Sequence, residues 1–190
     1  KPSWMTYGVL KDLSRKDLLQ TLKDHGFEGV EFRTDANQGH GVEACIDAAE
    51  QKQVIADCDA AGIRIISIAT GNRYHDKDAG ELANHIAETK VRMDLAAALG
   101  APRVRVFGNN FLEDVPRKET ISQVARALNE LAEYGVKRGV KPSLELHGEF
   151  DWQACKAVAE QVDHENFGLI WNSVPGDIVD GSVKKALDTV

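Results

Sequence analysis

Six short apolar segments alternate with helical segments along this chain, and their starts lie about 25 to 40 residues apart. Such alternation predicts parallel strands joined by helical crossovers, within a single domain over residues 1–190. The predicted strands are residues 3–10, 29–33, 63–68, 103–107, 142–147 and 167–171. The predicted helices are residues 15–24, 42–61, 79–99, 116–138 and 152–162, and Ser182 is expected to cap a last short helix.

Polar side chains recur on one face of these strands. Because side chains alternate along a strand, this face is predicted to carry Glu31, Arg33, Arg105, Glu145 and His147. In a barrel one strand face meets the helices and the other meets the lumen. Polar lumen residues near strand ends are typical of a barrel active site. The segment after the first strand also lacks the glycine-rich phosphate loop that an open doubly wound sheet usually has.

We therefore expect a (β/α)8-type TIM barrel, with an open sheet as the alternative. A full eight-unit barrel takes about 250 residues, whereas these 190 residues supply about six βα units. We expect the chain to be truncated before closure, because a sheet of six strands would leave unpaired edges. An incomplete or assembled barrel is the other interpretation.

Composition excludes several classes of protein. The net charge is −7 with no block of Lys and Arg, so no nucleic-acid partner is expected. No apolar run approaches the roughly 20 residues of a membrane span. The three cysteines are scattered without CxxC spacing, which argues against a disulfide framework or a zinc knuckle. We expect a cytoplasmic protein, and export stays open because the chain begins at Lys1 rather than Met.

The segment 142–150 concentrates the groups that carry chemistry. Glu145 and His147 share the polar face of the fifth strand, next to a glycine that suits a loop, and we take both as catalytic candidates. The alternative is that Glu145 is structural and pairs with a lumen arginine such as Arg105, since buried carboxylates need a partner. His147 has three candidate roles, which are substrate binding, metal contact and proton transfer, and the alternative is that it is a structural residue.

Four further residues are candidates for substrate binding. Asn72 and His75 lie in the predicted loop after the third strand, where barrel enzymes usually contact substrate. Arg105 faces the lumen, and Trp171 offers an apolar wall for a sugar face, although core packing is the favoured role for it.

Four segments together resemble the xylose isomerase-like barrels, the sugar phosphate isomerase/epimerase group that also contains AP-endonuclease-type enzymes. They are Gly26-Phe-Glu-Gly-Val-Glu-Phe-Arg33, Leu99-Gly-Ala-Pro-Arg-Val-Arg-Val-Phe107, Leu144-Glu-Leu-His147 and Gly168-Leu-Ile-Trp-Asn172. The resemblance covers essentially the whole chain. It implies a divalent metal, of the kind Mn, Co, Zn or Mg, held near the top of the barrel.

The resemblance also implies which residues hold that metal. Glu145 matches the family's ligand at the end of the fifth strand. Asn172 and Pro175 stand where the family usually has an aspartate and a histidine. An Asn oxygen brings no charge and binds a hard cation more weakly. The family's ligands from the seventh and eighth strands have no counterpart in these residues.

The predicted activity is isomerisation or epimerisation of a small sugar, sugar phosphate or polyol. In such reactions a proton moves next to a carbonyl, and a metal stabilises the developing enediolate. A lyase or dehydratase begins in the same way, so it stays open. A non-catalytic carbohydrate-binding barrel is the alternative from another class, and homo-oligomer formation is also left open.

Overall fold

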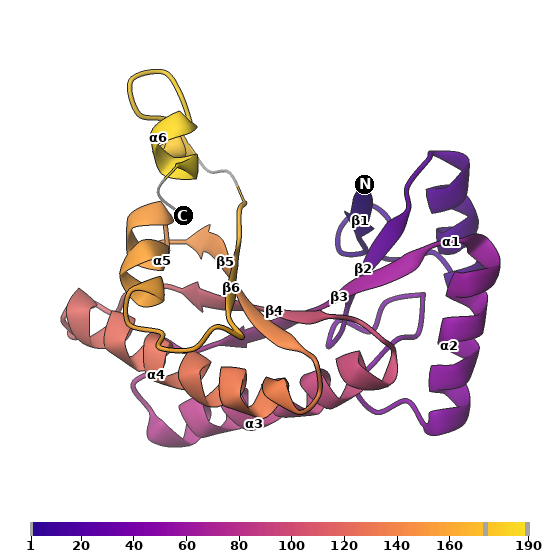
Figure 1. Cartoon of the computed structure of the whole chain (residues 1–190), viewed down its shortest axis with the longest axis horizontal. Helices are drawn as coiled ribbons and strands as arrows, with labels where there is room; N and C mark the ends of the chain where they lie inside the picture. Colours follow the sequence, from indigo (N-terminus) through magenta and orange to yellow (C-terminus); the bar gives the residue numbers. More distant parts are fainter. Residues whose placement is uncertain (1, 173–174, 189–190) are drawn as a thin grey trace.

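The computed structural model describes residues 2–172 and 175–188, and in this part of the chain six parallel strands form one sheet. The strands pair in sequence order, so each βα unit lies beside the next. They are β1 (Ser3–Met5), β2 (Gly29–Arg33), β3 (Arg64–Arg73), β4 (Arg103–Asn109), β5 (Lys141–Gly148) and β6 (Gly168–Ile170). Figure 1 shows the sheet curved, with helices along one face and none along the other. The architecture is the predicted one, six parallel βα units that form an arc of a TIM barrel.

The helices lie between consecutive strands. They are α1 (Arg15–Asp24), α2 (Ala48–Ala61), α3 (Ala79–Ala98), α4 (Arg117–Val136) and α5 (Trp152–Ala159), followed by a 3-10 turn, η1 (Pro175–Asp177), and a short α6 (Lys184–Leu187). Side-chain oxygens of Asp47, Asp78 and Asp151 accept backbone N–H groups in the first turns of α2, α3 and α5. These caps satisfy donors that have no partner inside the helix and so fix where each helix begins.

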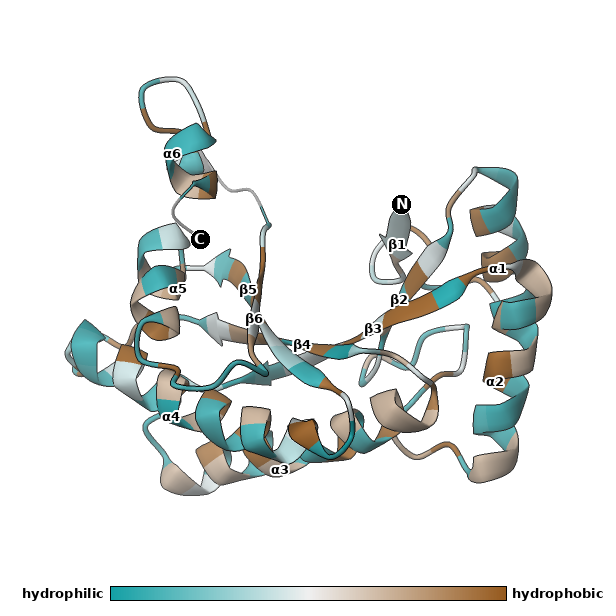
Figure 2. Cartoon of the chain, viewed as in Figure 1, coloured by the Kyte–Doolittle hydropathy of each residue, from teal (hydrophilic) through white to brown (hydrophobic). Residues whose placement is uncertain are grey.

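The pairing of the strands separates the two faces of the sheet. Residues that pair in a parallel register share a face, so Phe32, Ile68 and Val104 lie together on the helix side. Each of them is fully buried. Figure 2 shows hydrophobic and hydrophilic bands along β2 to β4. The hydrophobic side therefore forms the core with the helices, and the polar side faces the concave surface of the arc.

Several predicted boundaries are wrong. The first strand ends at Met5 instead of residue 10. The helix predicted over residues 42–61 begins only at Ala48, because Asp47 caps it. Residues 70–73 were expected in a loop but continue β3, where the hydroxyl of Thr70 donates to the carbonyl of Arg105 on β4. The ends of α3, α4 and α5 each fall one to three residues earlier than predicted.

Two further expectations concern the last helix and the cysteines. Val183 takes the cap position of α6 without a side-chain bond, while the Ser182 hydroxyl accepts the N–H of Lys184. All three cysteines are free, and burial raises the pKa of the Cys58 and Cys155 thiols to about 12. Such thiols are poor nucleophiles at neutral pH.

Among the described residues, no helix is long and apolar enough to cross a membrane.

Candidate functional site

A cavity of about 320 Å³ opens on the concave face of the sheet, toward the C-terminal ends of the strands. This is the end at which barrel enzymes bind their ligands. Its lining comes from β1, β2, β4, β5 and the segments that follow β1 and β6: Met5, Tyr7, Arg33, Arg105, Phe107, Glu145, His147 and Asn172. Four of the sequence candidates, Arg105, Glu145, His147 and Asn172, thus meet in one place.

Arg105 is the centre of an ion network in this cavity. Its Nη1 donates to Glu145 Oε2, and its Nε lies 3.5 Å from Glu31 Oε1. The side chains of Arg105, Glu145 and Glu31 are only 8%, 8% and 13% exposed. The small residues Ser67 and Ala69 stand on β3 between Glu31 and Arg105, so the guanidinium can reach across that strand.

The register of the strands explains how Glu145 meets its other neighbours. Glu145 pairs with Phe107 on β4 and with Ile170 on β6, so all three share the concave face. Asn172 follows Ile170 by two residues and returns to the same face. Its Nδ2 donates to Glu145 Oε1 over 2.8 Å. Both carboxylate oxygens of Glu145 therefore have a hydrogen-bond donor.

Burial shifts the pKa of two charged groups in the site. The pKa of Glu31 is raised because burial penalises its charged form more than Arg105 stabilises it. The pKa of Arg33 is lowered by burial and, secondarily, by the positive charge of Arg105. The site thus contains a carboxyl group that retains its proton more readily than usual.

His147 lies at the exposed rim of the cavity. Its ring packs on Phe107 with centroids 4.5 Å apart, and the Arg105 guanidinium lies 4.6 Å from the centre of the same Phe107 ring. After His147 the chain turns at Gly148, whose φ of 64° favours glycine. The imidazole is accessible to a ligand in the cavity, whereas Glu145 lies deeper.

The divalent metal that the resemblance implies would need oxygen ligands that are free to bind it. Glu145 is held by Arg105 and Asn172, and Asn172 presents its amide nitrogen rather than the oxygen that a metal requires. Within residues 2–172 and 175–188, no three His, Cys, Asp or Glu side chains are grouped so that they could hold a metal ion. In this arrangement the residues do not fit a divalent metal.

Three sequence candidates do not line the cavity. Asn72 lies on β3 rather than in a loop, and its Nδ2 donates to Glu88 Oε2 of α3 over 2.7 Å. His75 is 8% exposed, and burial lowers the pKa of its imidazole. Trp171 is half-buried against the hydrophobic core. The structure therefore does not bring their side chains to Glu145.

Sequence reasoning did not select Arg33, Tyr7 or Phe107 as candidates, although all three line the cavity. A signal existed for Arg33, since it shares the parity of Glu31 in the second strand. Tyr7 carried no such signal, because it follows β1 in a segment without regular structure.

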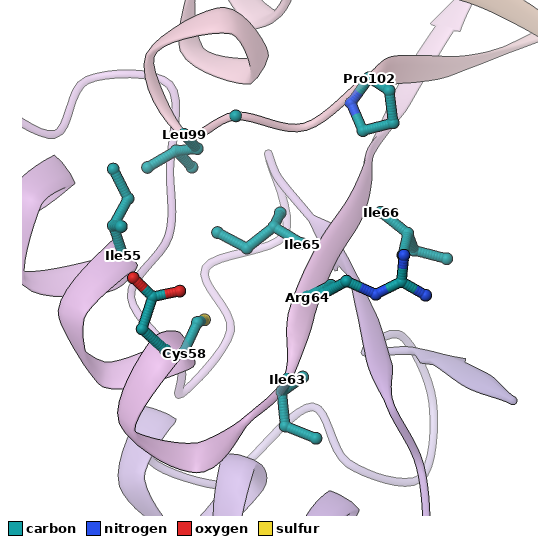
Figure 3. A pocket seen from close by; sticks show the side chains of 10 residues that line it. Ile55, Cys58, Ile63, Arg64, Ile65, Ile66, Leu99 and Pro102 are labelled. Carbon is teal, nitrogen blue, oxygen red and sulfur yellow. The ribbon is translucent and has the colours of Figure 1, made fainter. Parts of the chain in front are cut away.

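A second cavity, of about 380 Å³, lies at the opposite ends of the strands (Figure 3). It is lined mainly by aliphatic side chains from the end of α2, the start of β3 and the turn before β4, including Ile55, Ile63, Ile65, Ile66, Leu99 and Pro102. In barrels this end contributes to stability rather than catalysis.

Comparison with known proteins identifies the family. Residues 19–173 match the xylose isomerase-like TIM barrels. The chain belongs to this family. Among curated protein sequences, none matches the chain significantly.

Solved structures share the family's fold with this chain. The IOLI protein with a bound zinc atom has a TM-score of 0.81 at 16% identity, over 100% of this chain and 68% of that one. D-psicose 3-epimerase in the presence of D-fructose has a TM-score of 0.80 at 14% identity, over 100% and 69%. The probable 3-DHS dehydratase AsbF from Bacillus anthracis has a TM-score of 0.68 at 16% identity, over 90% and 62%.

The chain spans only part of the family members that it matches. It covers 64% of a xylose isomerase domain protein from Planctomyces limnophilus. It covers 26% of a fusion of a xylose isomerase-like TIM barrel with 4-hydroxyphenylpyruvate dioxygenase. At these low identities the likeness shows the fold alone, and the activity has to be argued from the site.

Proposed function

We propose that this chain forms most of the active site of an isomerase or epimerase that moves a proton next to the carbonyl of a small sugar or polyol. The observation that carries the proposal is the buried Glu145 carboxylate, which faces a polar cavity and is paired with Arg105. Structural neighbours named as sugar epimerases add support at the level of the fold. A small-molecule sugar is thus the proposed partner.

The chemistry requires a base and a group that stabilises negative charge. Glu145 accepts the proton from the carbon beside the carbonyl, and the electron pair of that C–H bond moves toward the carbonyl oxygen. The Arg105 guanidinium, freed from part of its contact with Glu145, donates to the enediolate oxygen. Protonation of the same carbon on its opposite face, by a group other than Glu145, gives the epimer, whereas transfer of the proton from Glu145 to the neighbouring carbon gives the isomer. Glu31, with its raised pKa, and His147 at the rim are the candidates to supply a proton to oxygen.

No step of the proposed reaction uses the divalent metal that the resemblance implies, because the described residues do not fit such an ion. Such an ion would act as a Lewis acid on the carbonyl. To bind Glu145 it would have to displace the Arg105 guanidinium, and the Asn172 amide would have to turn its oxygen inward.

The test is exchange of substrate protons with solvent deuterium. Purified protein is incubated in D2O with a panel of ketoses and keto-acids, with and without Mn²⁺, and NMR detects loss of the proton next to the carbonyl. We expect exchange that Glu145→Gln slows by about 100-fold or more. The exposed Glu113 supplies the matched control, Glu113→Gln. Equal exchange rates in the Glu145→Gln variant and the control would refute the role of Glu145.

A dehydratase is the second candidate, because one matched structure carries that description. Both reactions begin with the same proton transfer, and the products separate them. Loss of water from the substrate in the NMR spectra would favour the dehydratase, whereas a new stereoisomer favours the epimerase. A non-catalytic sugar-binding barrel would bind a sugar without any exchange.

A further inference from the structure

Arg33 lines the same cavity, and within residues 2–172 and 175–188 it forms no ion pair with a carboxylate. Its Nη1 is buried and has no hydrogen-bond partner in the part of the chain that the structure describes. The nearest ring is that of Tyr7, 5.9 Å from the guanidinium carbon. Arg33 as a whole is half-buried, but a buried donor atom without a partner is costly, so proteins usually pair it.

Other arginines with mostly buried side chains are paired. Arg15 contacts Glu50 and Asp57, Arg92 contacts Asp35, and Arg105 contacts Glu31 and Glu145. Asp35, only two residues beyond Arg33, is thus already engaged by Arg92. The negative charges of Asp35 and Glu43 stabilise Arg33 in part, but no carboxylate among the described residues forms an ion pair with it on the wall of the cavity.

The position of Arg33 places a second positive charge near Arg105. Both residues pair with Ala69 of β3, so they lie at one level of the sheet on either side of a methyl group. The charge of Arg105 contributes to the lowered pKa of Arg33, which shows that the two guanidinium groups influence each other. The space over Ala69 is consequently flanked by two guanidinium groups.

The guanidinium of Arg33 packs closely against Gly71. A Cβ atom at Gly71 would lie 2.8 Å from Arg33 Nη2. That distance is shorter than any normal contact, so a side chain at residue 71 would shift the guanidinium from its present place.

We propose that Arg33 binds the anionic end of the substrate, a phosphate ester or a carboxylate, so that the substrate is a sugar phosphate or a sugar acid rather than a neutral sugar. This inference rests on the proposed function for the identity of the substrate as a sugar. Arg33 is on β2 and Glu145 is on β5, and the strands β3 and β4 lie between them. An anionic group at Arg33 therefore leaves the rest of a short sugar chain extending toward Glu145. A guanidinium is well suited to this role, because its planar donors match carboxylate and phosphate oxygens in pairs.

The experiment measures anion binding by calorimetry, separately from turnover. The probes are inorganic phosphate, D-gluconate as a carboxylate, and D-glucose as a neutral control. We expect saturable binding of at least one anion and none of D-glucose at the same concentration. Arg33→Gln should weaken anion binding about tenfold or more. Comparison of the two anions tells whether phosphate or carboxylate is preferred.

Two further variants control this measurement. Arg64→Gln removes an exposed arginine that lines the other cavity, and it should leave anion binding unchanged. Gly71→Ala keeps every charge but displaces the Arg33 guanidinium, and it should weaken binding less than Arg33→Gln. Circular dichroism and urea unfolding verify that each variant is folded.

The outcomes separate this inference from the proposed function. Equal anion affinity in wild type and Arg33→Gln, or no anion binding by folded wild type, overturns the inference. Deuterium exchange that depends on Glu145 would still support the proposed function in that case. Conversely, anion binding that depends on Arg33 without any deuterium exchange would support the inference on the anion site and refute the proposed activity.

Discussion

Acid should destabilise this protein through His40, a fully buried imidazole in the loop that follows β2. Its Nδ1 accepts the N–H of Val42 over 3.0 Å, so Nε2 carries the proton and lies 2.9 Å from Gln38 Oε1. A second proton would have to enter at Nδ1, where it would face the N–H of Val42. Burial and, secondarily, the charge of Arg15 lower the pKa of His40 from 6.5 to about 4.

The size of the effect follows from this shift. A pKa difference between the unfolded and the folded state converts to free energy at about 1.36 kcal/mol per unit. A fall from 6.5 to about 4 therefore corresponds to about 3 kcal/mol. Because the folded pKa is the lower one, the unfolded chain takes up the proton first. Stability from this group is complete above pH 6.5 and is lost as the pH falls to about 4.

Urea unfolding at a series of pH values between 7 and 4 measures this loss. Other groups also titrate in this range, so the quantity to follow is the difference in unfolding free energy between wild type and His40→Gln. We expect this difference to fall by about 3 kcal/mol from pH 7 to pH 4. His25→Gln, at an exposed histidine, is the matched control. A difference for His40→Gln that stays constant with pH would refute the reasoning.

Two further predictions concern Glu31 and Gly135. Glu31→Gln should gain stability relative to wild type as the pH rises from 4 to 7, because burial raises the pKa of Glu31 and the unfolded chain releases that proton first. Urea unfolding at both pH values checks this, and a gain that shrinks with rising pH would contradict it. Gly135→Ala in α4 should cost about 1–3 kcal/mol despite the better helix propensity of alanine, since its Cβ would lie 2.0 Å from the Val140 carbonyl oxygen. Gly176→Ala, which meets nothing within 4 Å, is the control, and equal urea midpoints for the two variants would show that the clash is relieved.

The periodicity of the sequence was sufficient to predict the topology. Alternating strand and helix segments require parallel pairing, and the structure confirms the pairing of all six strands in sequence order. Helix α1 was also predicted to the residue, because Ser14 caps it and Gly26 follows its end. The start of α2 was missed although Asp47 and Glu50 form a recognisable capping signal. Residues 42–47 are apolar enough to imitate another helical turn.

The site was predictable only where strand parity determines direction. Glu145 and Arg105 follow the parity of their strands and meet as the structural alternative for Glu145 anticipated. Asn72 was expected in a loop, whereas β3 continues to Arg73 and gives Asn72 the parity of Ile68, on the helix side, where its amide contacts α3. How far a strand continues depends on its pairing with the neighbouring strand, which one strand's sequence does not report. A role for Glu145 and Asn172 in metal binding stays a prediction.

The distribution of charge in the cavity gives the two ends of the site different properties. Arg33, Arg105 and the Glu145 carboxylate line it, and Glu31 contacts Arg105, so the four formal charges cancel, but they are not evenly paired. Arg105 contacts both Glu31 and Glu145, which leaves Arg33 as the positive end on β2. In the proposed mechanism Glu145, at the other end on β5, accepts the proton. The proposal therefore predicts that a substrate with one anionic end is held in a single direction, with its reactive carbon toward Glu145. A neutral sugar would lack this orientation, because neither of its ends would satisfy Arg33.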